Sequence, residues 1–420
     1  MASASQRAGR GTRVRTLLPR WTGARHGAML GATRASRRGA LRTAQAVAAS
    51  PTDRRSSIPV PDITGLQELG YSPRWRALFA PYAAQGLSPA RVVRSDRGSA
   101  LVATSAGVVR AEPAAHLRKS AAGPADLPAV GDWVAVRMPD DDGLPQMEAV
   151  LERASAITRG DPGKNSETQV LAANVDTVLV VHPIAEPANL RRIERELSLA
   201  WDSGAAPVVV LTKADLSAEP DAVRAAVESV ALGVDVVLMN ALTAEGVEPL
   251  LAYISEHRTA VVIGPSGAGK STLINTLLGE QRQETRTVRV GDGRGRHTTV
   301  ARELFPMPGG GVLIDTPGLR ALGLTGSEEG ISSVFPDVGL LARACRFRDC
   351  SHDDEPGCAV RAAVEAGELA PERLASYLKL LGEAQDAATK TDARLRAQEA
   401  RKGKATAKAA RDYDKRDGRA

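Results

Sequence analysis

The stretch VVIGPSGAGKSTLINTLLG, from Val261 to Gly279, decides the fold of this chain. An apolar strand runs into a glycine-rich turn, and the turn opens a helical segment. Gly264 to Ser271 fits the pattern G-x-x-x-x-G-K-S, in which backbone N–H groups and a helix N-terminus bind phosphates. Lys270 is expected to bridge the β- and γ-phosphates, and the Ser271 hydroxyl to occupy one Mg²⁺ position. The predicted phosphate contacts are Gly264, Pro265, Ser266, Gly267, Ala268, Gly269, Lys270, Ser271 and Thr272.

Apolar strands alternate with helical segments on both sides of this stretch, from Val175 onward. The upstream runs VDTVLVVHPI, PVVVLTKADL and VDVVLMNAL each precede a helical pattern, and GVLIDTPGL ends another strand downstream. Such alternation is typical of a doubly wound, mostly parallel α/β sheet. Ligands bind at the carboxyl ends of the strands in these sheets, so motifs that follow a strand are candidates for the site.

A base-reading motif follows the strand PVVVL: Thr212, Lys213, Ala214 and Asp215. A carboxylate at Asp215 can accept hydrogen bonds from guanine N1–H and N2–H₂, which adenine does not offer, so it predicts selection of GTP. Lys213 is expected to lie over the base. The usual first residue of this motif is Asn, and the shorter Thr212 is expected to loosen the loop. Asn240 and Ala241, after VDVVLM, are candidates for the last contact to the base.

Two further segments predict the rest of the phosphate and Mg²⁺ site. Asp315 ends the strand GVLID, 45 residues after Lys270. It can hold Mg²⁺, and the N–H of Gly318 can meet the γ-phosphate. Between them lies GRGRHTT, where Thr298 or Thr299 can complete the Mg²⁺ shell while GTP is bound.

The three cysteines of the chain fall within 14 residues, which suggests a metal site in a reducing compartment more than a disulfide framework. Cys345, Cys350 and Cys358, with His352, offer three thiolates and an imidazole, the usual tetrahedral set for structural Zn²⁺. Four protein ligands leave no open position, so a structural role is expected. The neighbouring Arg343, Arg346 and Arg348 are either phosphate contacts or ordinary solvated charges.

Ahead of the sheet, residues 66–159 predict a short helix and then about five short strands separated by Gly, Pro and Asp. Five strands in so short a segment indicate a small closed barrel, either an OB-fold or an SH3-like barrel.

Charge is distributed unevenly along the chain. The whole chain carries +6, but residues 1–60 carry +11 and residues 390–420 carry +6, so the centre carries −11. Affinity for nucleic acid is therefore expected from the tails or from local patches. The first 60 residues suggest a disordered arm, a transit peptide, or a wrongly assigned start ahead of Met29. The chain contains no run of about 18 apolar residues, so no membrane span is predicted.

In combination these motifs resemble the circularly permuted GTPases, specifically the ribosome small-subunit-dependent GTPase A family. The resemblance covers roughly residues 62–390 and is carried by VGDWV, QVLAANVD, TKAD, GPSGAGKSTLIN, GRGRHTT, DTPGL and the cysteine block. It implies a permuted P-loop GTPase domain between an N-terminal OB-type β-barrel and a C-terminal helical zinc-binding domain. The base motif precedes the P-loop in the chain, but moving the chain ends leaves the strand-end loops in place.

The resemblance also implies a GTP hydrolase that binds the small ribosomal subunit and its rRNA and assists late maturation. It implies a GTP substrate with Mg²⁺, one structural Zn²⁺, a monomer without membrane attachment, and a cytoplasmic location, with an organelle as the alternative. Leu319 stands where small GTPases often place a water-orienting Gln, so low intrinsic turnover stimulated by a partner is expected, with His297 as the candidate catalytic residue.

Two other functions fit part of the sequence. The P-loop alone is shared with small-molecule kinases and ATPases, against which Asp215 and the Thr298/Thr299 loop argue. The missing Gln leaves open a non-catalytic RNA-binding assembly chaperone that holds GTP as a structural ligand. The expected organisation is a basic arm 1–60, an OB-type barrel 61–165, a GTPase domain 170–325, a zinc-binding helical domain 327–389 and a basic tail 390–420.

Overall fold

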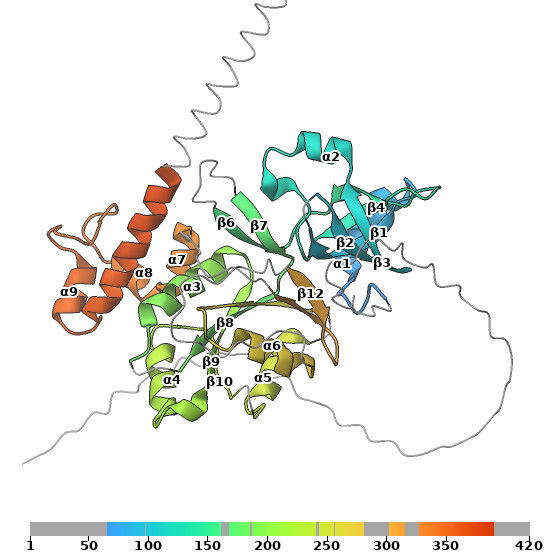
Figure 1. Ribbon diagram of the computed structural model, residues 1–420. Coiled ribbons are helices and arrows are strands. Elements are labelled where there is room, and N and C mark those ends of the chain that lie inside the picture. Colours follow the sequence, from blue (N-terminus) through green and yellow to red (C-terminus); the bar gives the residue numbers. More distant parts are fainter. Residues whose placement is uncertain are drawn as a thin grey trace, which may run out of the picture. The chain divides into compact units, whose positions relative to one another are not determined.

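Figure 1 shows the computed structural model, which describes residues 65–96, 98–160, 168–184, 187–240, 243–255, 257–280, 302–315 and 327–389. The expected arm and tail lie outside these ranges. So do five of the predicted site residues, namely Ala241, His297, Thr298, Thr299 and Gly318.

The centre of the structure is a sheet whose first five strands in spatial order are all parallel. In that order the strands are β10 (Val236–Leu238), β9 (Ala206–Thr212), β8 (Thr177–Pro183), β11 (Thr259–Ile263), β13 (Val312–Asp315) and the antiparallel β12 (Glu303–Pro306). The apolar runs of the sequence form the buried strands β8, β9 and β11. The doubly wound sheet predicted from the sequence is confirmed.

Helices cover both faces of this sheet, because alternate residues of each strand point to opposite sides. Val178 and Val180 of β8 pack with α3 and α4, whereas Leu179 and Val181 of the same strand pack with α5 and α6. Two short 3₁₀ turns, η2 (Ala214–Leu216) and η3 (Ala252–Ile254), follow β9 and α5. The helices are α3 (Leu190–Asp202), α4 (Pro220–Glu228), α5 (Val247–Leu251) and α6 (Lys270–Leu278).

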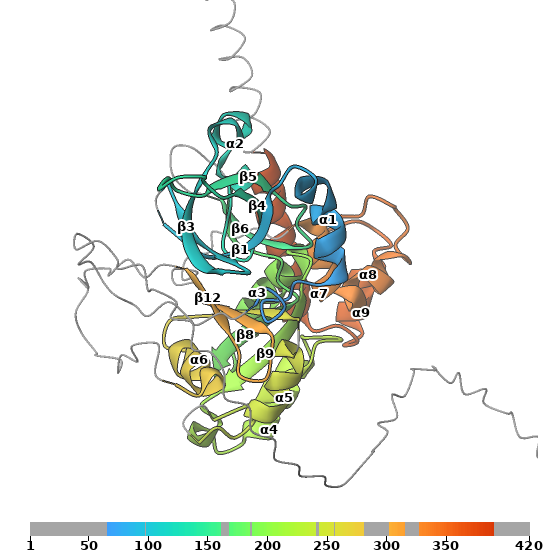
Figure 2. The same cartoon turned by 90° about the vertical axis from the view of Figure 1, so that its right-hand side faces the viewer.

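The N-terminal strands form a closed five-stranded barrel, best followed in Figure 2. The order β1-β2-β3-β5-β4 closes where β4 pairs with β1, and β3 runs parallel to β5. The five strands are β1 (Ser88–Ser95), β2 (Ala100–Thr104), β3 (Gly107–Pro113), β4 (Trp133–Arg137) and β5 (Gln146–Val150). The flanking helical segments are α1 (Pro73–Ala83), α2 (Ala115–Ser120) and η1 (Pro124–Asp126).

The barrel is connected to the central sheet by strand pairing in space and by a hairpin in the sequence. Arg94 of β1 pairs with Glu303 of β12, so the barrel and the sheet form one continuous hydrogen-bonded array. The hairpin of β6 (Ala156–Gly160) and β7 (Thr168–Ala173) is a separate two-stranded sheet between them in sequence. The expected boundary between residues 165 and 170 falls within this hairpin.

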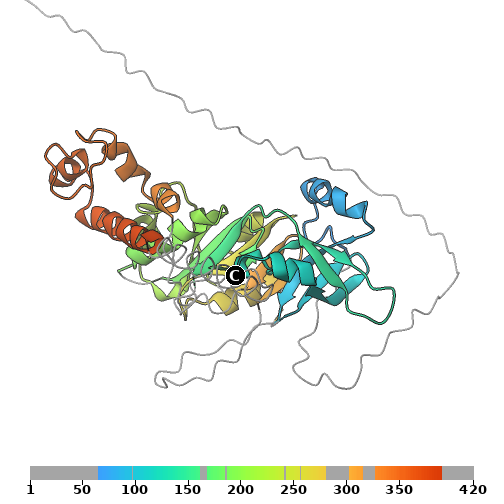
Figure 3. The ribbon, with the colours of Figure 1, turned by 90° about the horizontal axis from the view of Figure 1, so that it is seen from above.

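The C-terminal region is helical, as predicted, and its helices are the orange to red segments of Figure 3. It comprises α7 (Glu328–Val334), α8 (Pro336–Ala342), α9 (Ala359–Glu365) and a helix over residues 371–389. α7 packs closely on α3, and a Cβ at Gly330 would overlap the Ser198 carbonyl oxygen of α3. Among the described residues, no helix combines the length and apolar character that a membrane span requires.

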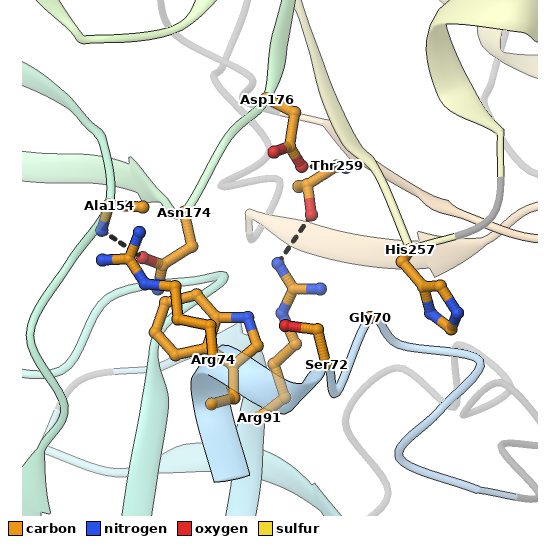
Figure 4. Close-up of a pocket in the computed structure, with 10 residues that line it drawn as sticks. Gly70, Ser72, Arg74, Arg91, Ala154, Asn174, Asp176, His257 and Thr259 are labelled. Carbon is orange, nitrogen blue, oxygen red and sulfur yellow. Dashed lines mark hydrogen bonds between the residues drawn. The ribbon is translucent and has the colours of Figure 1, made fainter. Parts of the chain in front are cut away.

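A buried arginine links the barrel to the central sheet. Arg91 of β1 is 1% exposed; its guanidinium donates to Gly131 O (3.2 Å), to Leu69 O, and to Thr259 Oγ1 at the start of β11 (2.8 Å). Figure 4 shows this guanidinium lining a small polar pocket between Thr259 and Ser72. Burial lowers the pKa of Arg91 to about 10, while the charge of Asp176 acts in the opposite direction.

Replacing Arg91 by Ala is expected to lower the free energy of unfolding by about 3–5 kcal/mol, because two buried carbonyl oxygens and the Thr259 hydroxyl lose a cationic hydrogen-bond donor. Chemical denaturation would measure this loss. The control is Arg110→Ala, which removes an exposed barrel ion pair to Asp96 (2.9 Å) and should cost at most about 1 kcal/mol. Equal losses in the two variants would contradict a linking role for Arg91.

Candidate functional site

The predicted phosphate loop connects the end of β11 to the start of α6. Gly264, Gly267 and Gly269 adopt φ values of 136°, 81° and 83°, which side chains rarely tolerate. A Cβ at Gly264 would also overlap the Val181 carbonyl oxygen of β8. Lys270, the first residue of α6, points back into the loop and donates from Nζ to the carbonyl oxygens of Gly264 (2.8 Å) and Pro265 (2.5 Å).

The base motif is hydrogen-bonded to the phosphate loop. Thr212, the last residue of β9, is fully buried, and its hydroxyl lies 2.6 Å from Ala268 O and 3.2 Å from His182 O. Lys213 takes a left-handed conformation (φ 59°) and donates from Nζ to Gly267 O at 2.9 Å. The short hydroxyl of Thr212 thus connects β9 to the P-loop, while the expectation that Thr212 loosens the loop relative to Asn stays a prediction.

The carboxylate of Asp215 lies beside the contact between the base motif and the phosphate loop. It lies in η2, is exposed, and makes no hydrogen bond or ion pair with the described part of the chain. Ala214 holds η2 against the next strand through its N–H to Met239 O, and Asn240 follows with a backbone bond to Glu245 O. The residues of the base motif thus lie at the carboxyl ends of β9 and β10, beside the P-loop.

Asp315 ends β13, the strand paired with the P-loop strand β11, and stands opposite Glu303 of β12. Burial raises the pKa of Asp315 to about 6; Lys270 opposes the shift and Glu303 adds to it. A carboxylate at Asp315 and the hydroxyl of Ser271 are oxygen donors of the kind that Mg²⁺ prefers. These two residues fit a magnesium site, and the other predicted members of it, Thr298, Thr299 and Gly318, lie outside the described residues.

The raised pKa predicts a pH dependence. An aspartate must be deprotonated to bind Mg²⁺, so the role expected of Asp315 predicts that Mg²⁺-dependent nucleotide turnover falls about tenfold per unit below a pH of about 6 and stays level above it. A pH profile at subsaturating Mg²⁺ would measure this. An aspartate with its ordinary pKa of 3.8 would hold activity to well below pH 5, and that result would contradict the prediction.

The cysteine cluster has the geometry of a four-ligand metal site. The ligand atoms of Cys345, Cys350, His352 and Cys358 all lie within 4.8 Å of one another. Cys345 Sγ lies 4.0 Å from Cys358 Sγ, and His352 Nδ1 lies 3.7 Å and 3.5 Å from these two sulfurs. Tetrahedral Zn²⁺ requires about 3.8 Å between two sulfurs and about 3.6 Å between sulfur and nitrogen. The cluster can therefore hold a metal ion, and its donors suit zinc.

Two buried residues beside the base motif were not predicted from the sequence. His182 at the end of β8 contacts Glu196 of α3 through its Nε2 (2.7 Å), and both side chains are buried. The available signal was the single imidazole in the otherwise apolar run VDTVLVVHPI. A lone histidine on a buried strand does not reveal its partner, because Glu196 comes from another element.

Comparisons with known proteins agree with this geometry. Residues 150–325 match the RsgA GTPase family. The chain is 49% identical over 341 residues to the small ribosomal subunit biogenesis GTPase RsgA of Streptomyces coelicolor, covering 80% of this chain and 91% of that protein. The RsgA protein of Syntrophotalea carbinolica is 43% identical, covering 81% of this chain and 94% of its own length.

Solved structures show the same fold. The crystal structure of YjeQ from Thermotoga maritima has a TM-score of 0.54 and 28% identity, covering 71% of this chain and 99% of that one. YloQ, described as a circularly permuted GTPase, has a TM-score of 0.53 and 24% identity, covering 72% and 96%. The two loops of the nucleotide site come in reverse order along the chain, and the relatives are this similar over most of its length. The chain therefore belongs to the RsgA family of circularly permuted GTPases.

Proposed function

We propose that this chain is a GTPase that binds the small ribosomal subunit and assists its late maturation, hydrolysing GTP to GDP and phosphate with turnover that the subunit stimulates. One observation carries the nucleotide part of the proposal: the Thr212 hydroxyl joins the base motif to the P-loop at Ala268. A base-selecting carboxylate and a phosphate cradle are thereby held side by side. The names of the relatives, small ribosomal subunit biogenesis GTPases, support the ribosomal part.

In this proposal each side chain has one task in binding GTP. Lys270 exchanges its bonds to the Gly264 and Pro265 carbonyls for the β- and γ-phosphate oxygens. Asp215 accepts the two guanine N–H groups, and Lys213 lies over the base. Ser271 and Asp315 would hold Mg²⁺, which supplies positive charge to the phosphates when it is bound.

The hydrolytic step is assigned to the loop and turn outside the described residues. Thr298 or Thr299 would complete the Mg²⁺ shell, Gly318 would contact the γ-phosphate, and His297 would orient the attacking water. Leu319 follows Gly318 where a water-orienting Gln often stands, so intrinsic turnover should be low. The subunit is then the partner that supplies or orients the missing group.

The C-terminal cluster is proposed to hold one structural Zn²⁺, because two of its sulfurs and the imidazole lie close to tetrahedral distances and all four ligand atoms lie within 4.8 Å of one another. Arg343, Arg346 and Arg348 beside it are exposed and make no ion pair within the described residues, which leaves them available to rRNA phosphates. We further propose that the chain acts as a monomer in the cytoplasm.

The test is nucleotide hydrolysis by the purified full chain, alone and with small ribosomal subunits, with ATP as the control nucleotide. The expected result is slow GTP turnover that rises at least tenfold with subunits, and no comparable turnover of ATP. Tight GTP binding without stimulation would instead favour a non-catalytic assembly chaperone. Hydrolysis of ATP as fast as GTP would contradict the role of Asp215.

A further inference from the structure

We propose that Arg373, in the C-terminal helical region, is a positioning residue for the guanine-binding motif and acts through helix α3. The inference rests on the proposed function and extends it to a group that touches neither nucleotide nor metal. Two buried acids of α3, Glu194 and Glu196, make the connection. Glu194 contacts Arg373 in the C-terminal helical region, and Glu196 contacts His182 near the end of β8, the strand paired with the base-motif strand β9.

The first half of the connection joins α3 to the base motif. Glu196 accepts from His182 Nε2 at 2.7 Å and from Arg192 Nε at 3.0 Å. The carbonyl oxygen of His182 lies 3.2 Å from the Thr212 hydroxyl, the same hydroxyl that contacts Ala268 of the P-loop. His182 and Glu196 are only 5% and 7% exposed, so the position of this acid on α3 is coupled to the end of β8 with little solvent between them.

The second half joins α3 to the C-terminal helices. Arg373 is 6% exposed and donates from Nη1 to Glu194 Oε1 at 2.6 Å. Its other nitrogens contact both carboxylate oxygens of Asp337, each at 3.0 Å, and Nη2 also contacts Val334 O at 2.7 Å. Ser376 donates to the second oxygen of Glu194. One guanidinium thus fixes α3, α8 and the helix over residues 371–389 relative to one another.

The geometry of α3 makes it a short rigid connector. Glu194 and Glu196 are two residues apart, so their side chains point about 200° apart around the helix. Gly330 lets α7 approach the α3 backbone closely, which leaves little room for independent sliding. A displacement of the C-terminal helices must either carry α3 with it or leave the Glu194 carboxylate without Arg373 and Ser376, and a buried charge without its partner is strongly destabilising.

A functional consequence follows from thermodynamic reciprocity. If the position of α3 affects how tightly the Thr212–Asp215 motif holds guanine, whatever displaces the C-terminal helices changes nucleotide affinity. By the same coupling, bound nucleotide changes the affinity of the C-terminal region for its partner. This coupling runs through α3 and the end of β8, so it does not depend on Asp315 or on the residues that follow Asp315 in the chain.

The test compares three full-length variants by the dissociation constants for GDP and IDP, measured with a fluorescent nucleotide and by competition. IDP lacks the N2 amino group, so the IDP/GDP ratio reports on the Asp215 contact. Arg373→Lys keeps the charge but cannot make the forked contacts. Ser376→Ala removes only one bond to Glu194 and is the milder variant should Arg373→Lys fold poorly. Arg195→Ala is the matched control, because it breaks a partly exposed ion pair between α3 and the same helix, Arg195–Glu383 at 2.6 Å.

The expected result is that Arg373→Lys weakens GDP binding at least fivefold and lowers the IDP/GDP ratio, that Ser376→Ala does so to a smaller extent, and that Arg195→Ala stays within twofold of the unchanged chain. Combining Arg373→Lys with Glu196→Gln should weaken binding by less than the product of the two single effects, as expected of one connected path.

Wild-type GDP affinity and an unchanged ratio in both Arg373→Lys and Ser376→Ala, at temperatures where each is folded, would overturn the inference. So would an equal loss in Arg195→Ala. Failure of the unchanged chain to bind guanine nucleotides would overturn the proposed function and this inference with it, and the two failures are therefore distinguishable.

Discussion

Asp215→Asn should lower the affinity for GTP at least about 1000-fold and create measurable affinity for XTP. A site built to accept two N–H groups from its ligand discriminates strongly once the pairing is broken. The Asn amide would place N–H against guanine N2–H₂, leaving a donor facing a donor. Xanthine has a carbonyl oxygen at that position, so the same amide can donate to it.

The folded state should tolerate this change, because Asp215 is exposed and makes no contact that holds its loop in the described structure. We expect a stability change within about 0.5 kcal/mol. Binding of GTP and XTP by titration calorimetry would measure the switch. Asp221→Asn is the matched control, since Asp221 is an exposed acid of α4 with only a 3.5 Å contact to Arg224. Unchanged GTP affinity in Asp215→Asn would rule out a base-reading role.

On the zinc site proposed for the C-terminal cluster, Cys358→Ser should abolish metal binding and with it most of the order of the surrounding loop. Structural zinc sites contribute on the order of 10 kcal/mol of binding free energy that is also folding free energy. Desolvation raises the pKa of the Cys350 thiol to about 11, and the neighbouring sulfurs add to the shift, so a thiolate at Cys350 needs a cation at neutral pH.

Cys358→Ser tests metal binding separately from a second role of Cys358 in the fold. Cys358 is the N-cap of α9 and accepts from Arg361 N at 3.4 Å. Serine is itself a good N-cap, so the helix start is preserved while a preferred zinc ligand is lost. Metal content by mass spectrometry and protease sensitivity near residues 345–358 are the measurements, with Ser351→Ala as the control. Full metal content in Cys358→Ser would contradict the four-ligand assignment.

The sequence predicted most of the parts that depend on local pattern. Continuous apolar runs identified β8, β9, β11 and β13, and the glycines of the P-loop identified the strand-to-helix turn that the structure contains. The cysteine spacing predicted a cluster whose ligand atoms meet. Each of these signals lies within about 15 residues of chain, where periodicity and turn chemistry determine the structure.

The remaining features depend on contacts between distant segments. The Thr212 hydroxyl contacts Ala268 from 56 residues away, so its role as a tie was invisible in the string TKAD. Arg91 and Arg373 appear in the sequence as ordinary charges, yet each is buried with partners from other elements. Nothing local distinguishes an arginine that will be buried from one that stays in solvent.

The order of the strands along the chain also sets the order in which the parts of the nucleotide site are synthesised. β8, β9 and β10 are consecutive in the chain and adjacent in the sheet, so they can pair through short connections as soon as they emerge. β11 then adds to the open edge of β8, and β13 adds to β11. The guanine-selecting loop is thus completed before the phosphate loop exists. A nucleotide can therefore use both loops together with Asp315 to stabilise a nascent chain only after all three have been synthesised.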